Sequence, residues 1–145
     1  MPSPQESLQN LQKIGQIKAE PPDQVEINGL VRSARRKLPD AHNPALSLES
    51  RFTLAYDAAH SLALAALRWH GYRSENRYTV FQVLGHTLSF PPAKWRFLDD
   101  CHKKRNVALY DGDFAEDEQL IGELIAVAKE LQIAVEALGP VAPAV

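Results

Sequence analysis

Apolar residues recur every three or four positions along most of this chain, and this period predicts amphipathic helices. The pattern is clearest over residues 48–70, where it runs through Leu48, Phe52, Ala55, Ala59, Leu62, Ala66 and Trp69. Alternating spacings of four and three form the apolar seam of a helix in an antiparallel bundle. No segment shows the alternation with a period of two that is typical of a half-buried strand. The sequence therefore predicts an all-α fold organised around this helix.

Proline and glycine separate the apolar stretches and set the expected helix ends. Five helices are expected, over residues 23–38, 48–70, 78–89, 95–110 and 115–138. Together they should form an up-and-down helical bundle, because short connections join neighbouring antiparallel helices. The residues expected in its core are Ala55, Ala59, Leu62, Leu98, Leu124, Leu131 and Val135.

A short additional helix is expected before the bundle. Ser3-Pro4-Gln5-Glu6 has the form of a capping box with proline at the first helical position, and the helix should run to about Lys18. It has few apolar positions, so it could be a mobile arm or an element that clasps a second subunit. The chain is thus divided into a helical arm and linker at 1–22, a bundle domain at 23–138 and a tail at 139–145.

Composition indicates one domain in a reducing compartment. The 145 residues are 45% hydrophobic, which is enough for one core. The single cysteine, Cys101, cannot form an internal disulfide and is expected to be a buried apolar residue rather than a nucleophile. The chain starts without a leader-like segment and has no run of eighteen apolar residues. We therefore expect a cytoplasmic protein with no membrane association.

Charge is polarised along the chain. Residues 1–110 hold 15 basic and 10 acidic side chains, whereas residues 111–145 hold 1 and 8. Four basic residues fall within six positions of the helix at 23–38: Arg32, Arg35, Arg36 and Lys37. They could contact phosphate, solvent, or the acidic last helix of the same chain. This cluster alone does not identify a nucleic-acid-binding protein.

The helix at 95–110 gathers the residues with the most chemistry onto one face. At 3.6 residues per turn its polar side carries Asp99, His102, Asn106 and Tyr110, with Arg105 beside them. Its other side can face a core through Trp95, Leu98, Cys101 and Leu109, and Lys103 and Lys104 add positive charge. Two interpretations stay open for the polar stripe: a solvated face with local hydrogen bonds, or a functional site.

No metal site and no cofactor are predicted. None of the five histidines pairs with another histidine, cysteine or carboxylate at a metal-ligand spacing, and His86 is expected to be a hydrogen-bonded, partly buried residue. Asp111-Gly112-Asp113 is expected to form a turn, because the remaining ligands of a calcium-binding loop are missing. A glycine-rich phosphate loop is also missing from the sequence.

Two segments resemble the HEPN superfamily of small helical-bundle proteins: HKKRNVALYDG at 102–112 and ESRFTLAYDAAHSLALAAL at 49–67. In that superfamily a helix near the end of the domain carries Arg, commonly followed by Asn, with His four to six residues further on. Arg105 and Asn106 match the start of this signature. Tyr110 stands where the family's ribonucleases place His, and no His follows Arg105. The resemblance covers roughly residues 23 to 138.

The resemblance implies a homodimer that pairs around the Arg-Asn helix, and surplus apolar residues on the last helix support a subunit interface. Without the motif His, it implies a non-catalytic or weakly active binding or regulatory module. Such modules occur in toxin-antitoxin and nucleotidyltransferase-partner systems, so a cognate toxin or antitoxin, or a nucleotidyltransferase, is an expected partner. RNA or nucleotide phosphate would bind near Arg105, with Asn106, Asp99, Lys103 and Lys104 contributing.

The alternative is a divergent metal-independent endoribonuclease of the toxin type. Its chemistry needs a proton acceptor, a proton donor and a cation for the phosphorane charge. Arg105 could supply the cation, and His102 is the only imidazole on that helix that could replace the motif His. Tyr110, with a reference pKa of about 10, is a poor proton acceptor at pH 7. The candidate catalytic residues are therefore Arg105, His102 and Tyr110.

Overall fold

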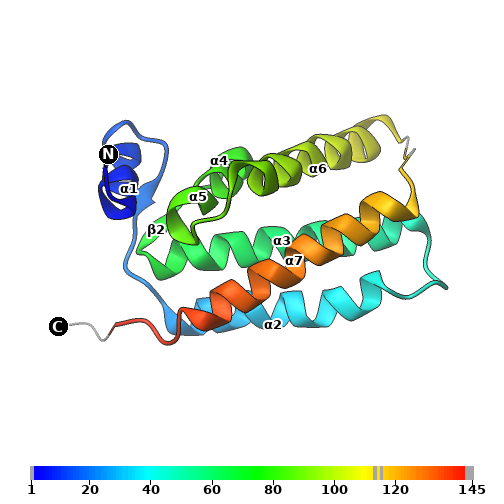
Figure 1. The fold of residues 1–145 in the computed structure, drawn as a ribbon, viewed down its shortest axis with the longest axis horizontal. Helices are drawn as coiled ribbons and strands as arrows, with labels where there is room; N and C mark the ends of the chain where they lie inside the picture. Colours follow the sequence, from blue (N-terminus) through cyan, green and yellow to red (C-terminus); the bar gives the residue numbers. More distant parts are fainter. Residues whose placement is uncertain (1, 113, 115, 143–145) are drawn as a thin grey trace.

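Helix α3 (Leu48–Trp69) runs through the centre of the fold, as its apolar seam predicted. The computed structural model describes residues 2–112, 114 and 116–142. Helices α2 (Gln24–Ala41) and α7 (Glu118–Ala137) pack along one side of α3 (Figure 1). Six alanines of α3 lie fully buried beside larger apolar residues, so the neighbouring helices can approach closely.

The opposite side of α3 is covered by the remaining helices of the bundle (Figure 1). These are α4 (Arg77–Gln82), α5 (Leu84–Thr87) and α6 (Pro92–Asp111). The all-α helical bundle predicted from the sequence is therefore confirmed. All seven residues expected in the core are buried, with Val135 the most accessible of them at 5%.

Several helix boundaries differ from the prediction, among them the start of α6, which lies at Pro92 instead of Trp95. Helix α2 continues through Pro39 to Ala41, because the side chain of Arg51 donates a hydrogen bond to the carbonyl of Ala41 and satisfies the end of the helix. The single helix expected over 78–89 is divided into α4 and α5 at Val83. Helix α7 begins at Glu118 with Asp117 as its N-cap, and Ala115, where it was expected to start, lies outside the described residues.

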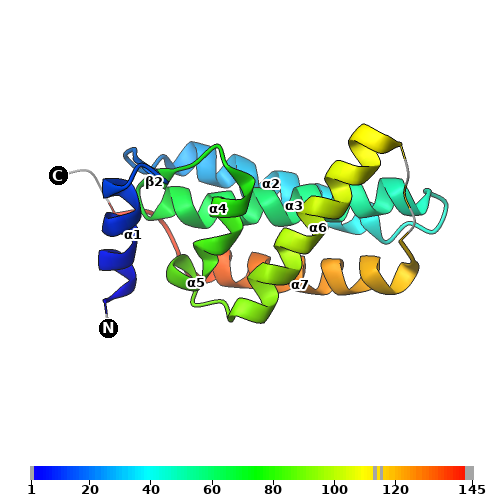
Figure 2. The same ribbon diagram turned by 90° about the horizontal axis from the view of Figure 1, so that it is seen from above.

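The N-terminal segment packs onto one end of the bundle. Helix α1 (Pro4–Lys13) ends five residues earlier than predicted, and Gly15 follows with a φ of +80°. A two-residue strand, β1 (Lys18–Ala19), then pairs antiparallel with β2 (Tyr72–Arg73). Figure 2 shows α1 across the end of the bundle, with Leu8 and Ile17 buried. Strands this short carry no recognisable period in the sequence.

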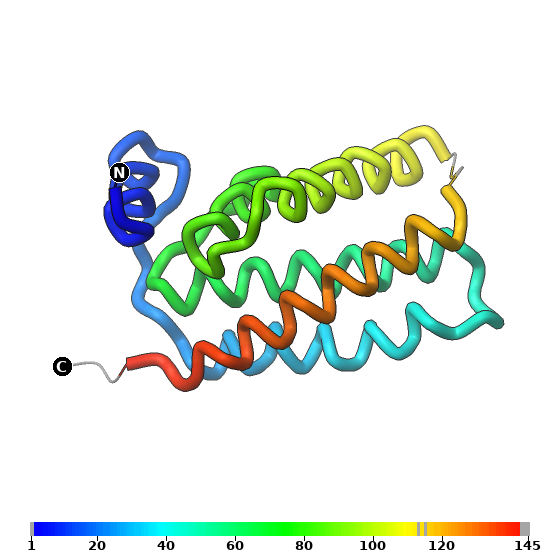
Figure 3. Tube along the Cα trace, in the orientation of Figure 1, coloured from blue at the N-terminus to red at the C-terminus, as the bar shows by residue number. Residues whose placement is uncertain are grey.

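Helix α6 crosses the bundle obliquely, and its C-terminal end projects from it (Figures 2 and 3). Leu98 and Cys101, in its first half, are buried. Leu109 was predicted to face the core, and this was wrong: the residue is 59% exposed because α6 has diverged from the bundle at that turn. Gly112 ends the helix with a left-handed φ of +74°. None of the helices in the described ranges combines the length and apolar character needed to cross a membrane.

Candidate functional site

A buried tyrosine on α3 connects the polar residues of α4 and α6. Tyr56 has no exposed surface, although its hydroxyl is polar. That hydroxyl lies 2.9 Å from Nδ1 of His102 and 3.2 Å from Nη1 of Arg77. Because a buried hydroxyl without partners is costly, these contacts fix the positions of both side chains.

Helix α6 supplies the three polar residues that surround this tyrosine. The ring of His102 stacks on the ring of Tyr56, with 6.1 Å between their centroids. The guanidinium of Arg105 lies 5.4 Å from the centroid of the Tyr56 ring, and Nδ2 of Asn106 lies 3.4 Å from Nε2 of His102. The predicted grouping of His102, Arg105 and Asn106 on one face of the helix agrees with these contacts.

Helix α4 contributes a second guanidinium on the same ring. Asn76 caps α4 by accepting a hydrogen bond from the backbone N–H of Thr79, and this places Arg77 at the first helical position. The guanidinium of Arg77 lies 5.6 Å from the Tyr56 centroid. Two cations therefore lie within cation–π distance of one aromatic ring.

A second imidazole lies one turn further along α3. His60 packs edge-on against Phe81, with 5.9 Å between ring centroids, and Phe81 makes a similar contact with Tyr56. Burial lowers the pKa of His60 to about 4, and the positive charges of Arg77, His102 and Arg105 act in the same direction. His60 is therefore neutral at pH 7. We call Tyr56, His60, Arg77, His102, Arg105 and Asn106 the Tyr56 cluster.

One assignment of donors and acceptors gives the hydroxyl proton of Tyr56 an acceptor. Arg77 can only donate, so the Tyr56 oxygen accepts from it. The Tyr56 hydroxyl then donates to Nδ1 of His102, which leaves the imidazole proton on Nε2. An Nε2–H needs an acceptor, so in this tautomer the Asn106 amide is turned to present its oxygen to Nε2 of His102. In the reverse arrangement the buried hydroxyl proton would lack an acceptor, so we adopt the first.

The charges of the Tyr56 cluster at neutral pH reside on its arginines. Burial lowers the pKa of His102, the charge of Arg77 adds to this, and Asp99 opposes it. Burial raises the pKa of Tyr56, although the hydrogen bond from Arg77 acts in the opposite direction. Tyr56 is thus a neutral donor, and the cluster combines two guanidiniums with neutral hydrogen-bonding groups. This combination suits an anion better than a cation.

Three predicted binding residues on α6 lie in ion pairs instead of at the Tyr56 cluster. Asp99 is largely buried and pairs with the exposed Lys103 at 3.3 Å. Lys104 pairs with Glu116 at 2.8 Å. Tyr110 lies on the projecting end of α6 with 79% of its surface exposed, and within the described residues its hydroxyl makes no hydrogen bond. These pairs anchor α6 and the start of the acidic C-terminal region.

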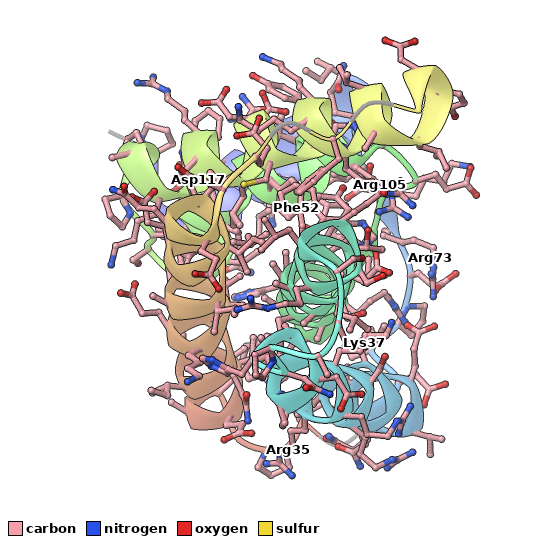
Figure 4. All side chains as sticks on the ribbon, turned by 90° about the vertical axis from the view of Figure 1, so that its right-hand side faces the viewer. Arg35, Lys37, Phe52, Arg73, Arg105 and Asp117 are labelled. Atoms are coloured by element: carbon pink, nitrogen blue, oxygen red, sulfur yellow. The ribbon has the colours of Figure 1, made fainter. Side chains whose placement is uncertain are left out.

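Among the basic residues of α2, one forms an ion pair within the chain and others are exposed to solvent. Arg35 pairs with Glu136 of α7 at 2.5 Å, which is the intramolecular option left open by the sequence. Acidic residues of the same helix also pair with Lys94 and Arg51. In Figure 4 the labelled Arg35 lies at the far edge of α2, whereas Arg105 lies beside α3 under α6. The basic residues of α2 and the arginines of the Tyr56 cluster therefore form separate basic regions.

Three members of the Tyr56 cluster were not predicted from the sequence: Tyr56, His60 and Arg77. Spacing along one helix groups residues of that helix only, and these three come from α3 and α4. One signal was available, because Tyr56 and His60 are polar residues four positions apart directly beside the apolar seam. Polar groups on a buried face need partners, and their spacing points to a shared polar site.

Within the described ranges, no group of three or more His, Cys, Asp or Glu side chains is arranged to hold a metal ion. Comparisons of the chain with protein-family models, curated proteins and solved structures give no match.

Proposed function

We propose that this chain is a HEPN-like homodimeric binding module that binds RNA or nucleotide phosphate at the Tyr56 cluster. One observation carries the proposal: Arg77 and Arg105 flank the same buried ring, and neither forms an ion pair with a carboxylate in the described part of the chain. The sequence resemblance around Arg105 and Asn106 supports the same region. The motifs of the two resembling segments also meet here, because Tyr56 and His60 belong to one and His102 to the other.

The geometry favours phosphate among anions. A guanidinium presents a planar set of donors that matches two phosphate oxygens at once. Arg77 donates a hydrogen bond to the buried Tyr56 hydroxyl, which already restricts the Arg77 side chain. Little of its conformational freedom therefore remains to be lost when an anion binds. The side-chain amide of Asn106 can add a hydrogen bond without adding fixed charge.

Binding rather than catalysis is the favoured role. Tyr110, at the family's His position, is 79% exposed, and within the described residues its hydroxyl makes no hydrogen bond to the Tyr56 cluster. The lowered pKa values of His60 and His102 make both imidazoles poor proton donors at pH 7. A module that binds phosphate without cleaving it fits a regulatory role beside a toxin, an antitoxin or a nucleotidyltransferase.

The dimer in this proposal forms around the projecting end of α6. Val107, Leu109 and Tyr110 are 49%, 59% and 79% exposed there, and a second copy would remove their apolar surface from water. Light scattering at micromolar concentration should report about twice the 16.1 kDa chain mass. L109E should shift the mass toward that of one chain, whereas a wild-type monomer would remove the dimer from the proposal.

Binding can be measured by fluorescence anisotropy with a labelled single-stranded RNA. R77A and R105A should each lower the affinity about tenfold or more, and should reduce the salt dependence of log K by about 0.7 per charge removed. R36A is the matched control, because Arg36 is an exposed arginine on α2 outside the Tyr56 cluster. Equal losses in all three variants would indicate a diffuse charge effect and contradict the proposal.

A divergent ribonuclease is the second candidate, favoured by the two imidazoles beside two guanidiniums. In this mechanism a neutral imidazole, His60 or His102, accepts the 2′-hydroxyl proton as the 2′-oxygen attacks phosphorus, and Arg105 stabilises the phosphorane charge. The bond from phosphorus to the 5′-oxygen then breaks, and this oxygen takes a proton from solvent. Cleavage of labelled RNA in the presence of a metal chelator, lost in H102A and R105A, would establish it. Y110H restores the family spacing from Arg105, and on this reading it should increase cleavage.

A further inference from the structure

The donors of the Tyr56 cluster come from three different helices. His60 belongs to α3, Arg77 to α4, and His102, Arg105 and Asn106 to α6. All five side chains are half-buried, whereas the Tyr56 ring, which His102, Arg77 and Arg105 contact, is fully buried. An anion at this cluster would therefore receive hydrogen bonds from several directions, not along one line.

We infer that the ligand of the Tyr56 cluster is a terminal phosphate monoester, at the end of an RNA strand or on a mononucleotide, rather than an internal phosphodiester. This inference rests on the proposed function and names its ligand class. A terminal phosphate offers three oxygens to donors on different sides. An internal phosphodiester offers two, because its other two oxygens are bonded to carbon.

Charge supports the same choice. A phosphate monoester carries about −1.5 to −2 at neutral pH, and a phosphodiester carries −1. Arg77 and Arg105 supply two positive charges within 5.6 Å of one ring centroid. A monoester balances this pair more closely than a diester does. The neutral imidazole of His60 can then donate a hydrogen bond without requiring an additional anion.

The surrounding carboxylates leave the arginine charge available to a ligand. Asp99, on the same helix as His102, is paired with Lys103 at 3.3 Å. Asp57 follows Tyr56 on α3, and within the described residues it forms no ion pair with Arg77 or Arg105.

The test compares otherwise identical ten-residue single-stranded RNAs by fluorescence anisotropy. One carries a 5′-phosphate, one a 3′-phosphate, and one has hydroxyl groups at both ends, with the dye attached at the end not under test. At least one phosphorylated strand should bind tenfold or more tightly than the hydroxyl strand. Uridine 5′-monophosphate should compete, and uridine should not. The two phosphorylated strands and the mononucleotide distinguish which source of the monoester the site accepts.

Variants separate this inference from the proposed function. R77A and R105A should abolish the preference for a phosphorylated end, and R36A should retain it. Equal affinity for all three strands, lost in R77A and R105A, would overturn the inference and leave the proposed function standing. If no strand and no mononucleotide binds, both fail. The folded state of each variant is checked by its circular dichroism and its thermal midpoint.

Discussion

Two clusters that each contain two arginines lie along helix α3, and they differ in how their charges are satisfied. At its C-terminal end Arg68 is only 1% exposed, and it donates to the backbone carbonyls of Glu20 and Pro21. It also pairs with the carboxylates of Glu20 and Glu26, and Arg73 pairs with both of these. We call these four side chains the Arg68 cluster. Its two positive charges are matched by two negative charges within the chain.

The Tyr56 cluster, three turns earlier on the same helix, has the opposite arrangement. Its arginines contact an aromatic ring and a hydroxyl, and the described residues provide them with no carboxylate partner. Arginine thus has a different role in each cluster, and the groups that it contacts determine which role it has. Arginines closed by carboxylates and carbonyls hold the fold together, whereas arginines held by neutral groups are available to an external anion.

The largest effect should come from removing the buried guanidinium. R68A leaves Glu26 with one partner fewer and three backbone carbonyls without their donor. We expect a loss of about 3–5 kcal/mol in the free energy of unfolding, the usual cost of breaking a buried ion pair. Urea denaturation measures it. R105A is the control and should lose less than about 1 kcal/mol; equal losses would remove the distinction between the clusters.

Acid should destabilise the protein through His60. Its pKa in the fold is about 4, below the ordinary value of 6.5, so the unfolded chain binds the proton first as pH falls. Stability is then complete above about pH 6.5 and decreases toward pH 4, by up to about 2 kcal/mol between pH 7.5 and pH 5.

Urea denaturation of wild type and H60Q over this range isolates the contribution of His60. Glu26 does not interfere, because the lowered pKa of that carboxyl makes its own loss of stability occur at still lower pH. The same slope in both proteins would show that His60 is not held neutral by the cluster.

The hydroxyl of Tyr56 should have an intermediate effect. Y56F removes the acceptor for Arg77 and the donor for Nδ1 of His102, so we expect a loss of about 1–2 kcal/mol in unfolding free energy. Titration by NMR should also show an altered pKa for His102, which a purely packing role would leave unchanged. Tyr78, 43% exposed, provides the matched control Y78F. An unchanged His102 titration would contradict the proposed hydrogen-bond direction.

Tyr110 should give the smallest effect. A ring that packed against the bundle with one hydrogen bond would contribute about 0.5–1.5 kcal/mol through that bond. Because Tyr110 is 79% exposed, Y110F should change the unfolding free energy by less than about 0.5 kcal/mol and leave RNA affinity unchanged. A larger loss that depends on protein concentration would instead place the hydroxyl in the dimer interface.

Periodicity predicted the helices because burial repeats along them. Ala55, Ala59 and Leu62 fall on one stripe of α3, and the structure buries all three. The stripe of α6 was predicted equally well at Leu98 but not at Leu109, because the divergence of α6 from the bundle is a property of the packed structure.

The candidate site was predicted only in part, for a related reason. His102, Arg105 and Asn106 lie within five positions of one helix, so spacing grouped them. Arg77 and Tyr56 reach the same point through the packing of α4 against α3 and α6. Arg68 shows a second limit. An arginine between Leu67 and Trp69 gives no sign in the sequence that its partners lie more than forty positions away.

The Arg68 cluster also determines where the chain can be cut. A fragment starting at Asp23 would retain every helix of the bundle but lose the Glu20 carboxylate and the carbonyls of Glu20 and Pro21. It would also lose Leu8 and Ile17, which cover the end of the core. Residues 4–22 therefore cover one end of the hydrophobic core. A shortened expression fragment should retain them together with the bundle.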